Sequence, residues 1–183
     1  MVAGSLAQAC RDGDEEAVQR LLDTGADPNE PTHLGWLYPV NPLHAAARNG
    51  HLSIMQNLIQ AGANVSVPDN LVFDTAVRGH ADALRLLFAA GARVDRSSKP
   101  PLLALRSADH FGLGEDEMLQ VAQVLIEAGA DIEARDYSGT PVLHIAVING
   151  RLRIVKFLVE AGASLESVDR INSTPLMDAA NFG

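Results

Sequence analysis

Six histidines are the residues of this 183-residue chain whose chemistry best suits metal binding or proton transfer. A metal site needs histidines a few positions apart, or a histidine near paired cysteines, so that several ligands converge on one ion. The chain has a single cysteine, Cys10, and neither His33 nor His110 has a second ligand at such a spacing. The sequence therefore predicts no metal site and no cofactor.

A second candidate lies in the stretch 107–116, where Asp109, His110 and Phe111 are followed by the acidic run 115–117. A histidine beside carboxylates can act as a general acid or base, so these three residues form our candidate for a small-ligand or catalytic site. The acidic run also precedes an apolar stretch, and acids stabilise the N-terminus of a helix. This structural interpretation explains the acids without catalysis, and no phosphate-binding or nucleophile motif accompanies them.

Composition and charge favour a helical protein that binds neither nucleic acid nor membranes. Only 4% of the residues are aromatic, and the net charge of −9 disfavours phosphate binding, which needs a basic face. Residues 32–112 are the exception, with 7 basic and 5 acidic side chains. No segment approaches the roughly 18 apolar residues of a membrane-spanning helix. A lone cysteine favours a reducing compartment, the cytosol or nucleus.

A repeated pattern provides the elements that must position any site. The stretches 41–64 (NPLHAAARNGHLSIMQNLIQAGAN) and 141–164 (PVLHIAVINGRLRIVKFLVEAGAS) align without a gap. The motif AGA, or a close variant, recurs with its glycine at 25, 62, 91, 129 and 162, at intervals of 37, 29, 38 and 33 residues. A period near 33 is typical of a solenoid, in which stacked neighbours bury what no unit can bury alone.

The pattern of each repeat predicts two short helices. In the stretch 173–180 (STPLMDAA), Thr174 can cap the first helix, and Pro175 fits its first turn. The first helix ends at a glycine, and a second helix follows until Gly162, which we expect in a left-handed cap. The apolar stripe of the second helix in the fifth repeat is predicted at Leu152, Val155, Leu158 and Val159.

These stretches, with GTPVLHIAVING, DRINSTPLMDAA and the AGAD and AGAN turns, resemble the ankyrin repeat over nearly the whole chain. The resemblance implies an all-α fold with short β-turns or hairpins, an ankyrin-repeat α-solenoid of about five and a half repeats. It implies a single domain, with repeats at approximately 5–31 (an N-terminal cap), 32–66, 67–95, 96–132, 133–165 and 166–183 (incomplete).

Departures from the pattern in the third, fourth and last repeats affect the expected packing. The third has NLVFDTAVRGH (70–80) in place of the Thr-Pro start and a preceding turn about four residues short, so we expect it to be the least stable layer. The fourth has eight extra residues between its helices, around 107–116. The last stops after one helix, so we expect a following segment or a partner to cover the apolar residues Leu176, Ala179, Ala180 and Phe182.

The resemblance also gives four histidines a structural role. His44 and His144 occupy the histidine of the family's Thr-Pro-Leu-His motif, and His51 and His80 follow the glycine between the helices. In the family these histidines hydrogen-bond between neighbouring turns, so we interpret them as structural. His33 and His110 lie outside the motif, in the two insertions.

A protein or peptide partner is the function that the resemblance implies, bound through the concave surface and the turn tips. The turn THLGWLYPV (32–40) is four residues longer than the regular one and holds His33, Trp36 and Tyr38. Trp and Tyr are typical of binding hot spots, so we predict Trp36 and Tyr38 as anchors. The alternative is that Trp36 packs onto its own repeat.

Residues just before each inter-helix glycine complete the predicted binding surface: Arg11, Arg48, Asn49, Arg78 and Asn149. The three arginines would suit a peptide with acidic and apolar residues. Two alternatives remain open. One is an enzyme or small-ligand binder that uses His33 and His110 in the two insertions, and the other is a spacer within a larger protein.

Overall fold

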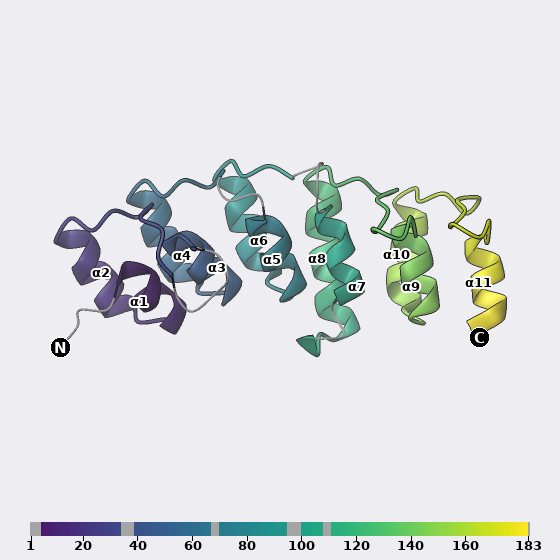
Figure 1. Ribbon diagram of the computed structural model, residues 1–183, viewed down its shortest axis with the longest axis horizontal. Helices are drawn as coiled ribbons and strands as arrows, with labels where there is room; N and C mark the ends of the chain where they lie inside the picture. The colour runs from purple at the N-terminus through teal and green to yellow at the C-terminus, as the bar shows by residue number, and fades with distance from the viewer. Residues whose placement is uncertain (1–4, 34–38, 67–69, 95–99, 108–110, 183) are drawn as a thin grey trace. The chain divides into compact units, whose positions relative to one another are not determined.

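The computed structural model describes residues 5–33, 39–66, 70–94, 100–107 and 111–182 (Figure 1). Within these ranges the chain is helical, and its only β-type pairings are two isolated bridges, Thr32 with Val40 and Arg135 with Pro141. The all-α prediction with short hairpins is therefore confirmed. No helix in the described part is long and apolar enough to cross a membrane.

The chain forms two compact units. Unit 1 contains residues 1–75 and 82–93, and unit 2 contains 76–81 and 94–183. The helices of unit 1 are α1 (Leu6–Asp12), α2 (Glu15–Asp23), α3 (Pro42–Arg48) and α4 (Leu52–Gln60). Those of unit 2 are η1 (Pro101–Leu103), α7 (Ala104–Ser107), α8 (Glu115–Glu127), α9 (Val142–Ile148), α10 (Leu152–Glu160) and α11 (Pro175–Phe182). Helices α5 (Leu71–Val77) and α6 (Ala81–Ala89) have residues in both units.

Local sequence explains where the helices begin and end. The side chain of Asn41 accepts a hydrogen bond from the backbone N–H of His44 at 2.7 Å, and Pro42 occupies the first position of α3. A side-chain oxygen at this position satisfies an N–H that has no partner inside the helix. Gly162, with φ of 101°, follows α10 in the left-handed region, as predicted.

Each unit buries its apolar side chains between stacked helices. In unit 1, α1 packs on α2 and α3, and α3 packs on α4. Three alanines of α3 (45–47) are fully buried beside Leu58 and Met55 of α4. In unit 2, α9 packs against α7, α10 and α11. In α3 these small side chains let the neighbouring helices approach closely.

The predicted stripe of α10 was wrong at Leu152, which is 76% exposed, whereas Leu158 is fully buried. The missed core residue is Ile154, at 1% exposure. Six positions separate Leu152 from Leu158, so they point about 120° apart around the helix axis. Ile154 precedes Leu158 by four positions and therefore shares its face.

The eight extra residues of the fourth repeat divide into two parts. Helix α8 has 13 residues, whereas α4 and α10 have 9 each. Four extra residues therefore form one additional turn at the start of α8, which includes the acidic run 115–117, and the remainder lengthen the connection before it. The carboxylate of Glu117 accepts the backbone N–H of Gly114 at 2.8 Å, which favours this early helix start.

The extra turn also contacts the following repeat. A carboxylate oxygen of Glu115 accepts the backbone N–H of Arg153 at 2.8 Å, near the start of α10. The guanidinium of Arg153 pairs in turn with the carboxylate of Asp116. Since α10 has no side-chain cap of its own, Glu115 takes over that role from the neighbouring helix.

We predict that Leu158→Ala lowers the free energy of unfolding by about 2–5 kcal/mol, because it opens a cavity between layers. Leu152→Ala, a matched change on the exposed side of the same helix, is expected to alter it by less than about 0.5 kcal/mol. Urea unfolding followed by circular dichroism measures both. Equal losses in the two variants would contradict the assignment of Leu158 to the core.

Candidate functional site

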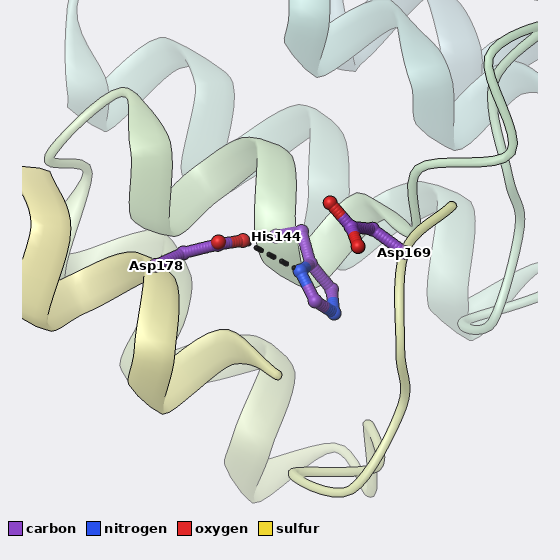
Figure 2. A group of neighbouring side chains, drawn as sticks. All are labelled: His144, Asp169 and Asp178. Carbon is purple, nitrogen blue, oxygen red and sulfur yellow. Dashed lines mark hydrogen bonds and ion pairs between the residues drawn. The ribbon is translucent and has the colours of Figure 1, made fainter. Parts of the chain in front are cut away.

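A buried histidine and two aspartates form a polar cluster in unit 2 (Figure 2). The Nδ1 of His144 lies 2.7 Å from a carboxylate oxygen of Asp178, and its Nε2 lies 3.0 Å from the carbonyl oxygen of Ser167. The other oxygen of Asp178 accepts the hydroxyl of Ser173 at 2.7 Å. His144 is fully buried and Asp178 is 4% exposed.

This cluster is a structural bridge between repeats. The ligand atoms of His144, Asp169 and Asp178 lie within 4.8 Å of one another, which is compatible in spacing with a metal ion. However, both ring nitrogens of His144 already face hydrogen-bond acceptors, and Asp169 accepts the backbone N–H groups of Ile171 and Ser173 at 2.9 Å each. Buried polar groups are normally satisfied in this way, so we interpret the cluster as structural.

The structural interpretation of the motif histidines agrees with two further contacts, both in unit 1. The Nε2 of His44 lies 2.9 Å from a carboxylate oxygen of Asp74, which is 30 residues further along the chain. The Nε2 of His51 lies 3.2 Å from the carbonyl oxygen of Arg11 in the preceding repeat. The role predicted for His44, His51 and His144 is thus confirmed. His80 is half-buried in unit 2.

The hairpin before α9 is a candidate recognition site, because hydrogen bonds within its turn fix side chains that are exposed. One carboxylate oxygen of Asp136 accepts the backbone N–H groups of Ser138 and Thr140, at 2.8 and 3.0 Å, and the Ser138 hydroxyl at 2.6 Å. Gly139 completes the turn with φ of 77°, a conformation that glycine adopts without strain.

The ionised form of Asp136 is stabilised by its surroundings. Burial by itself would raise the pKa of this carboxyl group, because it disfavours the charged form. The hydrogen bonds from Ser138 and Thr140, and the guanidinium of Arg106, outweigh burial and lower the pKa below its ordinary value. The Nη1 of Arg106 lies 2.7 Å from the second oxygen of Asp136.

Arg106 also fixes the aromatic side chain at the hairpin tip. Its Nη2 donates to the hydroxyl of Tyr137 at 2.9 Å, and its guanidinium carbon lies 4.6 Å from the ring centroid. Tyr137 is nevertheless 85% exposed. Beside it is a hollow of about 360 Å³, lined by Arg106, Asp136, Ser138, Thr140, Ile145, Ile148 and Asn149. A lining that combines apolar side chains with a few polar groups is typical of a recognition site.

The residues predicted from sequence are distributed between the two units. Asn149 lines the hollow of unit 2. Arg78 and Phe111 also belong to unit 2, where the Arg78 guanidinium lies 5.1 Å from the Phe111 ring centroid. In unit 1, Arg11 pairs with Asp12 at 3.1 Å and Asn49 donates to the carbonyl of Ala45 at 2.8 Å.

The remaining predicted residues are exposed, half-buried or outside the described ranges. His33 is exposed and Arg48 is half-buried, both in unit 1. Trp36, Tyr38, Asp109 and His110 lie outside the described residues.

Sequence reasoning missed Arg106 and Tyr137 as site residues. Tyr137 lies in the stretch ARDYSGTP, where the Asp-x-Ser-Gly spacing indicates a tight turn and therefore places the aromatic ring at its tip. The partner of that turn, Arg106, is 30 residues from Asp136, and no local pattern connects them.

Comparison with known proteins places these features in a family. Models of ankyrin repeats match residues 6–98 and 113–159. The human ankyrin repeat and SOCS box protein 2 is 38% identical over 102 residues, which cover 53% of this chain and 15% of that protein. An L-asparaginase of Dirofilaria immitis is 29% identical over 178 residues, which cover 95% of this chain and 29% of that protein.

A solved structure agrees in fold. The ankyrin repeat domain of human ASB11 has a TM-score of 0.75 at 24% identity, and the match covers 97% of this chain and 77% of that one. The chain thus spans less than a third of the length of the curated relatives described above.

We predict that Asp178→Ala lowers the free energy of unfolding by about 1–3 kcal/mol, because it leaves His144 buried without its carboxylate acceptor. The matched control is Asp82→Ala, which removes an exposed carboxylate from α6. Chemical denaturation at neutral pH compares the two. A loss no larger in Asp178→Ala than in the control would contradict the structural role of the bridge.

A second prediction concerns acid. Since the pKa of Asp136 is lowered on folding, its contribution to stability is complete above the ordinary value and is lost as pH falls through the lowered pKa. Asp136→Asn should therefore cost about 1 kcal/mol at pH 7 and lose less stability than wild type between about pH 4 and pH 2. Melting curves across this range measure the effect. Glu166→Gln, at an exposed position, is the control, and parallel curves for wild type and Asp136→Asn would contradict the prediction.

Proposed function

Because the chain belongs to the ankyrin-repeat family, whose repeats are protein–protein interaction modules, we propose that it binds a partner protein through the Tyr137 hairpin and the adjacent hollow of unit 2. The observation that carries this assignment is an aromatic side chain that is both exposed and fixed. Tyr137 gains little from burial in the free protein, yet Arg106 holds its hydroxyl and its ring. Tyr and Arg are the residue types enriched at binding hot spots.

The hollow beside the hairpin supplies the second element of an interface. Ile148 is 38% exposed and lines it together with Ile145, which is 6% exposed. Asn149, Ser138 and Thr140 line the same hollow and contribute polar groups. A partner side chain that enters the hollow would therefore exchange water for apolar contact and still find hydrogen-bond partners among the lining residues.

In unit 1 we propose a second contact region, formed by the long turn 32–40 together with Arg11, Arg48 and Asn49. Its anchors would be Trp36 and Tyr38, and His33 is exposed on the same turn. The proposal is supported by the residue types, since the repeat pattern does not require two aromatics in this turn.

We also propose that the chain performs no chemistry of its own and works in the cytosol or nucleus. Asp136, the acid that lines the hollow, is fully engaged in holding its turn, which is support for a structural role. The similarity to L-asparaginase covers 29% of that protein. The single cysteine, Cys10, is buried, and burial raises the pKa of its thiol to about 12, so the reactive thiolate is suppressed.

The test is site-specific photo-crosslinking in extract from the cells that express the protein. A photoreactive phenylalanine analogue replaces Tyr137, Trp36 or, as a control, the exposed Leu152 of α10. We expect a discrete protein adduct from position 137, one from position 36, and none from position 152. Adducts of equal strength from all three positions, or from position 152 alone, would contradict the assigned surface.

A further inference from the structure

The two neighbouring hairpins of unit 2, which join α8 to α9 and α10 to α11 in Figure 1, present the same kind of tip. Asp169 accepts backbone N–H groups at positions 171 and 173, as Asp136 does at 138 and 140. Asn172, with φ of 59°, takes the place of Gly139. One exposed apolar side chain stands on each tip: Tyr137 at 85% and Ile171 at 82% exposure.

Two arginines connect the two hairpins through hydrogen bonds to backbone carbonyl oxygens. The Nη1 of Arg135 donates to the carbonyl oxygens of Gly139 and Val168, at 2.9 and 2.7 Å. The Nη2 of Arg170 donates to the carbonyl oxygen of Tyr137 at 3.2 Å. The hydrogen bonds thus run in both directions across the pair of hairpins, which fixes the two guanidinium groups beside the two apolar tips.

Both guanidinium groups can still pair with a carboxylate of a ligand. Their hydrogen-bond partners within the described residues are carbonyl oxygens and not carboxylates, and both side chains are exposed. A guanidinium has five N–H donors in a planar fork, and each arginine uses one nitrogen for these bonds. The unused edge of each guanidinium group can donate two parallel hydrogen bonds to a carboxylate.

Three carboxylates of these hairpins have hydrogen-bond partners other than Arg135 and Arg170. Asp136 and Asp169 are occupied by the backbone N–H groups of their own turns, and Glu133 accepts the backbone N–H of Ser164 at 2.7 Å. At long range the net charge of −9 still repels a polyanion. The surface therefore favours a ligand with one carboxylate rather than many.

We propose that these two tips bind an extended segment of a partner protein in which one Asp or Glu is flanked by apolar side chains. The carboxylate pairs with Arg170 or Arg135, and the apolar side chains lie on Tyr137 and Ile171. This inference rests on the proposed function and adds the chemistry of the partner to it. A role of the arginines as hairpin braces alone predicts effects on stability without effects on ligand choice.

The test begins with a phage library of random linear peptides of about 12 residues, roughly 40 Å when extended, selected on the wild-type chain. The peptide that is most enriched is then synthesised with a fluorescein label and titrated by fluorescence polarisation. We expect it to contain one acidic residue between apolar residues. Replacing that acid by its amide should weaken binding by about tenfold, because a charge-assisted pair is lost. Converting polar residues outside this apolar–acidic–apolar stretch to Glu should also weaken binding, because the chain has a net charge of −9.

Variants of the chain locate the binding. Arg170→Ser and Ile171→Ser should each weaken binding by about tenfold, and Arg170→Lys by about threefold, since lysine keeps the charge but not the fork. Arg20→Ser, an exposed arginine of α2 in unit 1, is the control and should change binding by less than about twofold. Melting curves confirm that each variant is folded before it is titrated.

The outcomes separate this inference from the proposed function. Peptides that lack an acidic residue, or that bind the Arg170 and Ile171 variants as tightly as wild type, would overturn the inference and leave a peptide-binding module that uses another surface. Failure to enrich any peptide would count against the inference. If the photo-crosslinking at position 137 also yielded no adduct, the proposed function would fail with it.

Discussion

The second helix of most repeats has only nine residues, and a helix of that length is not stable by itself in water. Its stability has to come from the apolar face that it buries against neighbours, such as Ile54 and Leu58 in unit 1 or Ile154 and Leu158 in unit 2. Glycine ends, side-chain caps and histidine bridges all serve to hold successive layers at the spacing that this burial requires. The extra turn of α8 serves the same end, because Glu115 caps α10.

The histidine–aspartate bridges show how polar groups are used inside this stack. His44 pairs with Asp74, and His144 pairs with Asp178, which lie 30 and 34 residues further along the chain. In each case the repeat that supplies the aspartate has an apolar residue, Phe73 or Met177, where the motif would have histidine. A buried pair of this kind contributes less net free energy than apolar packing, but it is satisfied in only one register. The bridges therefore specify how one layer sits on the next.

Features that depend on nearby residues could be predicted from the sequence, and features that depend on distant contacts could not. The helix pairs and the left-handed glycines follow from caps and spacing within a few residues, and the structural histidines were predicted from the resemblance to the family's motif. The prediction of the apolar stripe of α10 was wrong at Leu152, because the first apolar residue of a helix need not face the core. The fourth-repeat insertion was recognised, but its division between connection and helix was not, because that depends on where Glu117 caps. The pairing of Arg106 with Asp136 spans 30 residues and has no local pattern.

The hairpin tips of unit 2 combine exposure with rigidity, and this combination needs a physical reason. An exposed tyrosine contributes little to folding, and a side chain that is free to move loses rotamer entropy when a partner binds. At position 137 that entropy is already reduced in the free protein, because Arg106 holds the hydroxyl and the ring while Asp136 holds Arg106. Asp136 is itself fixed by three donors of its own turn. Preorganisation of this kind lowers the entropic cost of association, which favours recognition over stability as the reason for the arrangement.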